Sequence, residues 1–314
     1  MSKKEKILIT GGSGYIGSML TPYLLSKNYE ITVLDNFMFR QHSLSQYCIN
    51  KDLEIINGDI RDESLVKNLL CKADIIIPLA AYVGAPLCKK DPFSAKSVNL
   101  DSQIFLLNNL SVNQKLLMPI TNSGYGIGDK DNFCDEESPL KPISLYGKHK
   151  VFVENEALQR ENSISFRLAT VFGMSPRMRL DLLVNDFVNR ACNDKFIVLF
   201  EGHFRRNFIH ILDVIKAFNF GLDNFDIMKK NAFNVGLSSA NLTKIELCKE
   251  IKKQIPDFFY HEAEIGRDPD KRDYLVSNKK IENLGYMPDV TLEKGIAELI
   301  KGNCMLSNKP YSNI

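Results

Sequence analysis

The sequence has no tryptophan, only five histidines among its 314 residues, and almost no excess of charge of either sign. With 40 Lys and Arg against 38 Asp and Glu, the net charge of +2 argues against the concentrated basic face that nucleic-acid binding requires. The histidines show no pairing typical of metal ligands, and the seven cysteines are scattered without a C-x-x-C. Such a pattern indicates neither a disulfide framework nor a zinc site. We therefore expect no bound metal and no nucleic-acid partner.

Long apolar runs are also missing. No apolar run of signal-peptide length precedes the first predicted strand. The most apolar later stretch, residues 75–87, is too short to span a bilayer and contains Pro78 and Pro86. We expect a cytoplasmic protein without membrane contact. Its 44% hydrophobic and 25% charged residues are typical of a globular chain, long enough for one large domain or two smaller ones.

Near the N-terminus, an apolar strand runs into a glycine-rich turn and then into a helix. Residues 7–9 are typical of a buried strand, and apolar residues recur at helical spacing over 16–24. The three glycines between them are Gly11, Gly14 and Gly17. Glycines let the backbone lie against a pyrophosphate, which the amides and dipole of the following helix attract. The order of strand, glycines and helix favours a dinucleotide site over a plain turn, and Pro22 is expected to kink the helix.

An acid ends the next predicted strand, residues 31–35. A carboxylate there accepts hydrogen bonds from the adenosine ribose hydroxyls and repels a 2′-phosphate, so Asp35 favours NAD over NADP. The alternative is a solvated acid at a strand end. Its position one strand after the glycines favours the ribose role.

A third strand is predicted at 53–56, and a short polar segment follows it. Within that segment, Asp59 could reach the adenine amino group and Ile60 could pack on the ring. We interpret Asp62 as the N-cap of a helix at 63–70.

Further strands are predicted at 74–79, 116–121 and 164–169, with a helix at 100–110. The residues after the first of these, Ala80 and Ala81, are small enough to leave room for a cofactor. Strands that alternate with helices in this way predict an α/β fold with a doubly wound parallel sheet and a ligand at the carboxyl ends of its strands. Pro119 is an awkward residue for an interior strand.

The second half has a mixed pattern. We interpret residues 1–173 as an NAD-binding domain and 174–314 as mainly a smaller α/β substrate-binding lobe, with part of 205–240 returning to the first domain. The tail after Gly302 is expected to fray. Helices are predicted at 182–192, 212–221 and 243–255, and strands at 196–200 and 232–235. The last predicted elements, at 279–284 and 292–300, are not assigned to a type.

Tyr146 and Lys150 are four residues apart, which on a helix places them on one face. A neighbouring ammonium and a positively charged nicotinamide both favour the phenolate, so Tyr146 could remove a hydroxyl proton while hydride leaves the same carbon. Lys150 would lower the pKa of Tyr146 and hold the nicotinamide ribose. Thr121, at the end of a strand, could hydrogen-bond the reacting oxygen. The alternatives are an ordinary solvated helix for the pair and a turn-forming hydroxyl for Thr121.

These features together resemble the extended short-chain dehydrogenase/reductases, the family of NAD-dependent sugar-nucleotide epimerases and dehydratases. The resemblance extends over nearly the whole chain. It rests on the GGSGYIG turn at 11–17, Asp35, GDIRD at 58–62, LAA at 79–81, Asn99, the Thr121 segment, Tyr146 with Lys150, and the segment 206–213.

The resemblance implies a Rossmann fold, NAD as cofactor, a nucleoside-diphosphate sugar as substrate and a homo-oligomer, a dimer or larger. It implies that Thr121, Tyr146 and Lys150 form a catalytic triad around C4 of the sugar, and that Arg206 and Arg272 grip the diphosphate. The predicted cofactor-binding residues are Gly11, Gly14, Tyr15, Ile16, Gly17, Asp35, Asn36, Asp59, Ile60, Leu79, Ala80, Ala81, Asn99, Tyr146 and Lys150. The predicted substrate-binding residues are Thr121, Thr170, Arg179, Asn185, Arg206 and Arg272.

Departures from the family pattern narrow the expected reaction. Dehydratases of the family carry Asp and Glu after the catalytic Thr, where this chain has Asn122 and Ser123, so elimination of water is not expected. The family members that both epimerise and reduce GDP-sugars carry a Cys where Ser123 stands. Thr170 replaces the usual Asn of an Arg-x-x-Asn-x-x-Gly segment. The run 175–181, followed by Asn185, resembles the branch that oxidises C4 of GDP-heptoses for capsule building.

The sequence thus predicts an NAD-dependent oxidoreductase acting at C4 of a nucleoside-diphosphate sugar, with a GDP-heptose as the leading candidate. A UDP-hexose 4-epimerase is the alternative, because both reactions need the same triad. A non-catalytic NAD-sensing regulator is a second alternative of another class. Such proteins typically lose the Tyr/Lys pair, which this chain retains.

Overall fold

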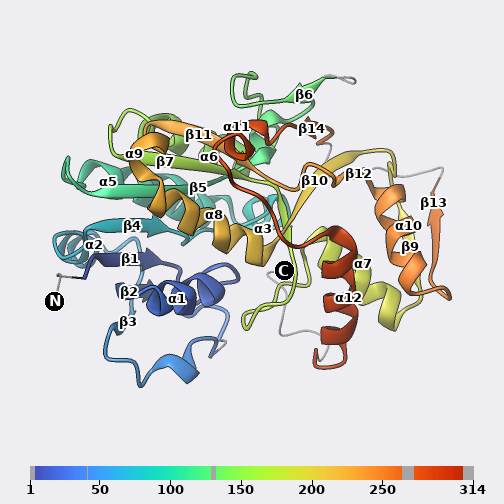
Figure 1. The fold of residues 1–314 in the computed structure, drawn as a ribbon, viewed down its shortest axis with the longest axis horizontal. Coiled ribbons are helices and arrows are strands. Elements are labelled where there is room, and N and C mark those ends of the chain that lie inside the picture. The colour runs from blue at the N-terminus through green and yellow to red at the C-terminus, as the bar shows by residue number, and fades with distance from the viewer. Residues whose placement is uncertain (1–3, 41, 129–131, 264–271, 307–314) are drawn as a thin grey trace.

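A seven-stranded parallel sheet forms the larger part of the molecule (Figure 1). The computed structural model describes residues 4–40, 42–128, 132–263 and 272–306. The order of the strands across the sheet is β11-β7-β5-β4-β1-β2-β3. Their bounds are β1 Lys6–Thr10, β2 Glu30–Asp35, β3 Leu53–Asn57, β4 Ile75–Pro78, β5 Lys115–Thr121, β7 Ser163–Leu168 and β11 Asn231–Val235. This doubly wound α/β architecture is the predicted one.

Helices cover both faces of the sheet, which explains why its central strands are apolar along their whole length. In β1, Ile7 and Ile9 belong to the core on one face, under α1 (Gly17–Ser26) and α8 (Ile211–Asp223). Leu8 points to the other face, into a second core that three further helices cover. These helices are α2 (Glu63–Leu70), α5 (Ser102–Asn108) and α6 (Leu145–Ala157).

The strand order reverses between β1 and β4. The chain passes from β1 to β2 and β3 on one side, and from β4 to β5 and β7 on the other. A crevice at such a switch point is where doubly wound sheets bind ligands. Gly11 follows β1 directly and has a φ of +70°, and a Cβ atom on it would lie 2.6 Å from the backbone nitrogen of Ala80 after β4. Only glycine fits between these two strand ends.

The second half builds a smaller lobe beside the carboxyl edge of the sheet (Figure 1). None of the helices in the described ranges is long and apolar enough to cross a bilayer. The helices of the second half, besides α8, are α7 Leu183–Asn193, α9 Phe225–Met228, α10 Lys244–Gln254, α11 Lys279–Glu282 and α12 Leu292–Asn303. Three small sheets pair as β12-β10-β8, β13-β9 and β14-β6. Their bounds are β6 Phe133–Cys134, β8 Thr170–Phe172, β9 Phe196–Leu199, β10 Arg205–His210, β12 Asn241–Thr243, β13 Phe259–Glu262 and β14 Leu275–Val276.

One strand from the second half, β11, lies in the large sheet, where it pairs in parallel with β7. The predicted domain boundary after residue 173 stays a prediction. The predicted fraying after Gly302 falls mostly outside the described residues, since α12 continues to Asn303 and the described chain ends at residue 306.

Several local predictions have clear outcomes. Asp62 is the N-cap of α2, as predicted, and its side chain accepts a hydrogen bond from the amide of Leu65. Pro22 lies inside α1, which continues past it to Ser26. The helix predicted at 100–110 is shorter, because α5 begins only at Ser102, after a turn of π-helix at Ser97–Asp101. The short helices α3 (Ala85–Lys90) and α4 (Pro92–Lys96) precede that turn.

Candidate active site

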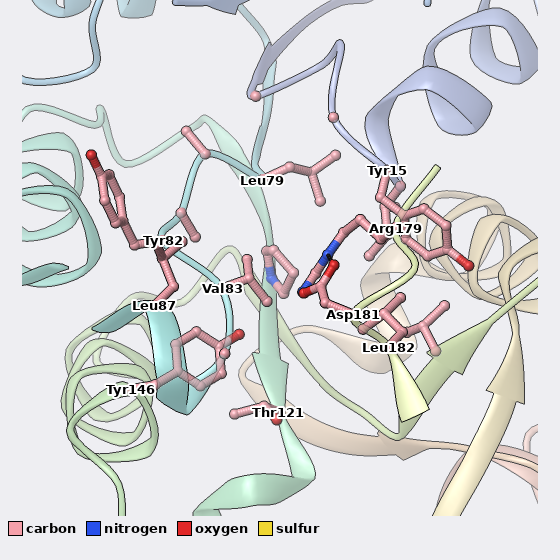
Figure 2. A pocket seen from close by; sticks show the side chains of 18 of the residues that line it. Tyr15, Leu79, Tyr82, Val83, Leu87, Thr121, Tyr146, Arg179, Asp181 and Leu182 are labelled. Carbon is pink, nitrogen blue, oxygen red and sulfur yellow. Dashed lines mark hydrogen bonds and ion pairs between the residues drawn. The ribbon is translucent and has the colours of Figure 1, made fainter. Parts of the chain in front are cut away.

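A deep cavity of about 480 Å³ lies at the switch point, a volume typical of small-molecule sites. The glycine turn and the ends of β2, β4 and β5 form one wall, together with the first turn of α6. Residues of the second half form the opposite wall, among them Thr170, Arg179 and Arg206. Figure 2 shows Tyr15, Arg179, Tyr146 and Thr121 around this space. Most of the predicted site residues therefore meet in one place.

The glycine turn offers donors to an anionic ligand. A Cβ atom on Gly14 would meet only the carbonyl of Gly11 at 3.1 Å, so the backbone there borders open cavity. The hydroxyl of Ser13 is buried and has no hydrogen-bond partner among the described residues. Buried polar groups are nearly always paired in native proteins, so this hydroxyl is available to a bound group. The turn fits a dinucleotide by its shape and by this donor.

Asp35, the predicted ribose ligand, ends β2 and lines the cavity. One carboxylate oxygen accepts a hydrogen bond from the amide of Ser13 over 3.0 Å, and the other accepts one from the amide of Phe37 over 2.9 Å. Burial raises the pKa of Asp35, and the two amides oppose that rise. Each oxygen retains a lone pair for a ligand hydroxyl.

Asp59 lines the same end of the cavity but is already paired. Arg61 donates to both of its carboxylate oxygens, over 2.8 and 2.7 Å, and this pairing lowers the pKa of Asp59 to about 2. The side-chain amide of Asn36 also donates to Asp59, over 3.3 Å. Ile60 is buried beside them and lines the cavity. The predicted contact of Asp59 with adenine stays a prediction.

The three predicted catalytic residues lie on two neighbouring elements. Thr121 ends β5, and its hydroxyl lies 2.9 Å from that of Ser123. Tyr146 and Lys150 lie on successive turns of α6, which begins at Leu145 because the side chain of Ser144 caps it. All three catalytic residues line the cavity.

Burial shifts the pKa values of both α6 residues. It raises the pKa of Tyr146 to about 12, while the positive charges of Arg179 and Arg272 act to lower it. Burial lowers the pKa of Lys150 to about 8. The sequence predicts that Lys150 lowers the pKa of Tyr146, whereas in the protein alone the arginines of the second half do so. At neutral pH, Tyr146 is therefore a phenol that can donate a hydrogen bond.

Cationic side chains gather on the wall formed by the second half. Arg179 is paired with Asp181, with 2.6 Å between its Nη2 and Oδ2. Arg206 donates to the carbonyl of Arg272, and Arg272 in turn donates to the hydroxyl of Ser123. The two arginines predicted to grip a diphosphate are therefore neighbours, and one of them reaches the catalytic end of the cavity. Such a cluster suits a bidentate phosphate ligand.

Two predicted ligand-binding residues, Asn99 and Asn185, are not among the residues that line the cavity, and their predicted roles stay predictions. Asn99 is fully buried, and its side-chain amide exchanges two hydrogen bonds of 2.8 Å with the backbone of Tyr82. Asn185 is also buried, and it bonds the amide of Gly173 and the carbonyl of Arg179. In both residues, the side-chain NH2 group donates to a backbone carbonyl and the side-chain oxygen accepts from a backbone amide. The backbone groups concerned line the cavity or lie next to it. These hydrogen bonds hold the backbone that forms the cavity wall.

Several polar residues that line the cavity were not predicted as site residues, among them Ser13, Arg177 and Lys244. Ser13 could have been found from its place within the glycine turn. Arg177 lies in the run 175–181, which resembles the GDP-heptose branch, and this resemblance marks Arg179 but not Arg177. Lys244 begins α10 and donates to the carbonyl of Phe200 over 2.9 Å. No sequence signal marks it.

Comparisons with known proteins agree with this geometry. The sequence profile of the NAD dependent epimerase/dehydratase family matches residues 7–236. A Methanocaldococcus jannaschii protein, provisionally assigned as a UDP-glucose 4-epimerase, is 27% identical over 96% of this chain and 99% of its own length. UDP-glucuronic acid decarboxylase 1 of Arabidopsis thaliana is 26% identical over 95% of this chain and 69% of its own.

Solved structures share the fold. The UDP-glucuronic acid 4-epimerase of Bacillus cereus, in complex with UDP-glucuronic acid and NAD, has a TM-score of 0.84 at 23% identity and covers 96% of this chain and all of its own. The UDP-glucose 4-epimerase of Thermus thermophilus, in complex with NAD, has a TM-score of 0.81 at 21% identity, with 95% and 99% of the two chains covered. At these identities the likeness establishes the fold alone.

Proposed function

The chain belongs to the NAD-dependent epimerase/dehydratase family, and from that premise we propose that it oxidises C4 of a nucleoside-diphosphate sugar. We propose a GDP-heptose as the sugar nucleotide and its 4-keto form as the product, made for capsule or other surface polysaccharide. The family membership establishes the enzyme class and its cofactor, NAD. The substrate and the outcome of the reaction are the proposal.

The convergence of Thr121, Tyr146 and Lys150 on one end of the cavity carries this proposal. The glycine turn and Asp35 line the same cavity, where a dinucleotide would be held. The arginines of the second half stand opposite the catalytic hydroxyls and supply positive charge for a substrate diphosphate. A sugar tethered by its diphosphate to these arginines would present a ring carbon to Thr121 and Tyr146.

The roles of the three residues follow from their chemistry. NAD, when bound, supplies the acceptor for the hydride that leaves C4. The positive charge of a bound nicotinamide would favour the phenolate of Tyr146 over the phenol. As the phenolate, Tyr146 takes the proton of the C4 hydroxyl, so the C–H and O–H bonds break as the C=O bond forms. Thr121 hydrogen-bonds the C4 oxygen and holds it beside the phenol. Lys150 contributes a positive charge that favours the phenolate once the phenol has lost its proton.

The residues after Thr121 support simple chemistry at C4. Asn122 is buried, and neither atom of its side-chain amide has a partner among the described residues. The Ser123 hydroxyl is bonded to Thr121 and to Arg272. Neither side chain is a carboxylate that could remove a proton from C5 or protonate a leaving hydroxyl. Loss of water is therefore not part of the proposed reaction.

A 4-epimerase acting on a UDP-hexose is the second candidate, favoured by the names of several relatives. It needs the same three residues and differs only in returning the hydride to the opposite face of C4. A non-catalytic NAD sensor of the same fold is a third candidate of another class. The retained and converging Tyr146 and Lys150 argue against it.

Product analysis with purified protein, NAD and a panel of GDP- and UDP-sugars, including heptoses, tests the proposal. NADH formed in equal amount to a 4-keto sugar, followed by absorbance and NMR, is the expected result with a GDP-heptose. A 4-epimer without net NADH would establish the epimerase instead. A dehydrated product would contradict the argument from Asn122 and Ser123. No change in any sugar despite bound NAD would favour the sensor.

A further inference from the structure

A segment of the second half crosses over the glycine turn of the first. This crossover segment, residues 173–182, connects β8 to α7. The phenol of Tyr15 donates to the carbonyl of Gly173 over 2.7 Å, and the hydroxyl of Ser175 donates to the carbonyl of Tyr15 over 2.8 Å. A third contact joins the hydroxyls of Ser18 and Ser175, 2.9 Å apart. The segment is thus fixed at its start to the turn that would hold the cofactor.

Arg177 extends from this segment toward the adenosine end of the cavity. Its guanidinium carbon lies 3.9 Å from the centre of the Phe39 ring, and only 2% of the residue is exposed. The Nη1 atom donates to the carbonyl of Met178 over 3.3 Å. Arg177 and Phe39 both line the cavity, as do Asp35 and Ser13. An arginine of the second half therefore reaches the same end as the predicted ribose ligand.

The electrostatics place Arg177 near Asp35. The positive charge of Arg177 opposes the rise in the pKa of Asp35. Burial and the neighbouring Arg179 lower the pKa of Arg177 to about 10, so it stays charged at neutral pH. A planar cation that is held on one aromatic ring suits a second flat partner or a ribose oxygen.

We propose that Arg177 is a cofactor-binding residue, contributed by the second half of the chain, which contacts the adenosine part of NAD beside Asp35. The crossover segment then forms one wall of the adenosine end. The proposal rests on NAD binding in this cavity but not on which sugar is oxidised. The alternative is that Arg177 only packs the crossover segment against Phe39.

Calorimetric titration of the purified protein with NAD and with ADP-ribose tests the proposal, because ADP-ribose contains the adenosine but no nicotinamide. We expect Arg177→Leu to weaken the binding of both ligands by about tenfold, the size of a lost cation–π or ribose contact. Arg177→Lys keeps the charge without the planar guanidinium, and we expect its affinity for both ligands to lie between those of the original protein and Arg177→Leu. The matched control is Arg190→Leu, an exposed arginine on α7 outside the cavity lining, which should leave both affinities within about twofold.

Affinities of Arg177→Leu within about twofold of the original protein for both ligands would overturn the proposal. A loss for NAD with none for ADP-ribose would overturn it too, because the effect would then not lie at the adenosine. If Arg177→Leu does not fold, Phe39→Leu takes its place, since Phe39 is partly exposed and its loss removes only the ring under the guanidinium. We expect Phe39→Leu to weaken the binding of ADP-ribose several-fold, and an unchanged affinity would overturn the proposal. These titrations contain no sugar nucleotide, so failure of the proposed sugar oxidation would leave their outcome unaffected.

Discussion

The ammonium of Lys150 donates a hydrogen bond to the carbonyl oxygen of Pro119, with 3.0 Å between the two atoms. Pro119 lies in the interior strand β5, two residues before Thr121. The bond therefore ties the helix that carries Tyr146 to the strand that ends at Thr121.

The first prediction concerns stability. Burial lowers the pKa of Lys150 from 10.5 to about 8, so the unfolded chain binds more protons than the folded one between these pH values. The contribution of Lys150 to the free energy of unfolding therefore rises as the pH increases from about 8 to 10.5. At pH 7, burying its charge costs on the order of 3 kcal/mol. We expect Lys150→Met to lose activity yet to have a larger free energy of unfolding at pH 7. Urea denaturation at pH 7, 8.5 and 10 measures it.

The gain in stability of Lys150→Met should shrink as the pH rises above 8 and vanish near 10.5. A gain that is independent of pH would instead indicate better packing of the methionine. A loss of stability at every pH would show that the hydrogen bond to Pro119 outweighs the cost of burying the charge.

A second prediction concerns Tyr146. Tyr146→Phe removes the phenol oxygen and keeps the ring, so we expect turnover to fall by at least about 100-fold, the range for a lost general acid or base. NAD affinity, measured by titration, should stay within about twofold. Unchanged turnover would contradict the proposed role of Tyr146.

A third prediction concerns the buried ion pair that fixes α6 to the sheet. Glu154 on α6 accepts hydrogen bonds from Nε of Arg167 on β7, at 3.0 Å to each oxygen, and both side chains are buried. We expect Glu154→Gln to lower the free energy of unfolding by about 3 to 5 kcal/mol, because Arg167 would be left without its counter-ion. Denaturant unfolding measures this loss.

The matched control for that variant is Glu161→Gln. Glu161 pairs with Lys230, and both side chains are more than half exposed. Loss of this exposed ion pair should lower the free energy of unfolding by less than about 1 kcal/mol. Equal effects of the two substitutions would refute the claim that burial makes the Glu154 pair important.

A fourth prediction concerns cofactor choice. Asp35→Asn removes the negative charge that would repel a 2′-phosphate, so we expect the ratio of NAD to NADP affinity to fall by about tenfold or more. Titration of both dinucleotides measures the ratio. If the ratio stays the same, Asp35 does not set the preference.

Much of the sheet follows from the sequence because its central strands are buried on both sides. Continuous apolar runs such as 75–79 have no other stable place in a fold of this size. The short strands of the smaller lobe were harder to identify. The strand β10, at Arg205–His210, contains three charged or titratable residues, and its pairing with β8 and β12 depends on segments far away in the chain. Such pairing cannot be predicted from the composition of the segment itself.

The site divides in a similar way. The resemblance to extended short-chain dehydrogenase/reductases is confirmed by the family match, and every predicted site residue except Asn99 and Asn185 lines the cavity. An asparagine that holds a loop carries the same donor and acceptor as one that binds a ligand, so only the fold distinguishes them. Arg177 reaches the adenosine end because the crossover segment folds back over the first half. The roles assigned to these residues remain predictions that the variants above test.

The pairing of β11 with β7 has a consequence for how the protein is made. During synthesis the first half leaves the ribosome with β7 as an open edge, because its partner at Asn231–Val235 is not yet translated. An open edge of an apolar strand can pair with another chain. The sheet is complete only when the chain has emerged as far as Val235, so a shorter nascent chain leaves the edge of β7 exposed to other chains.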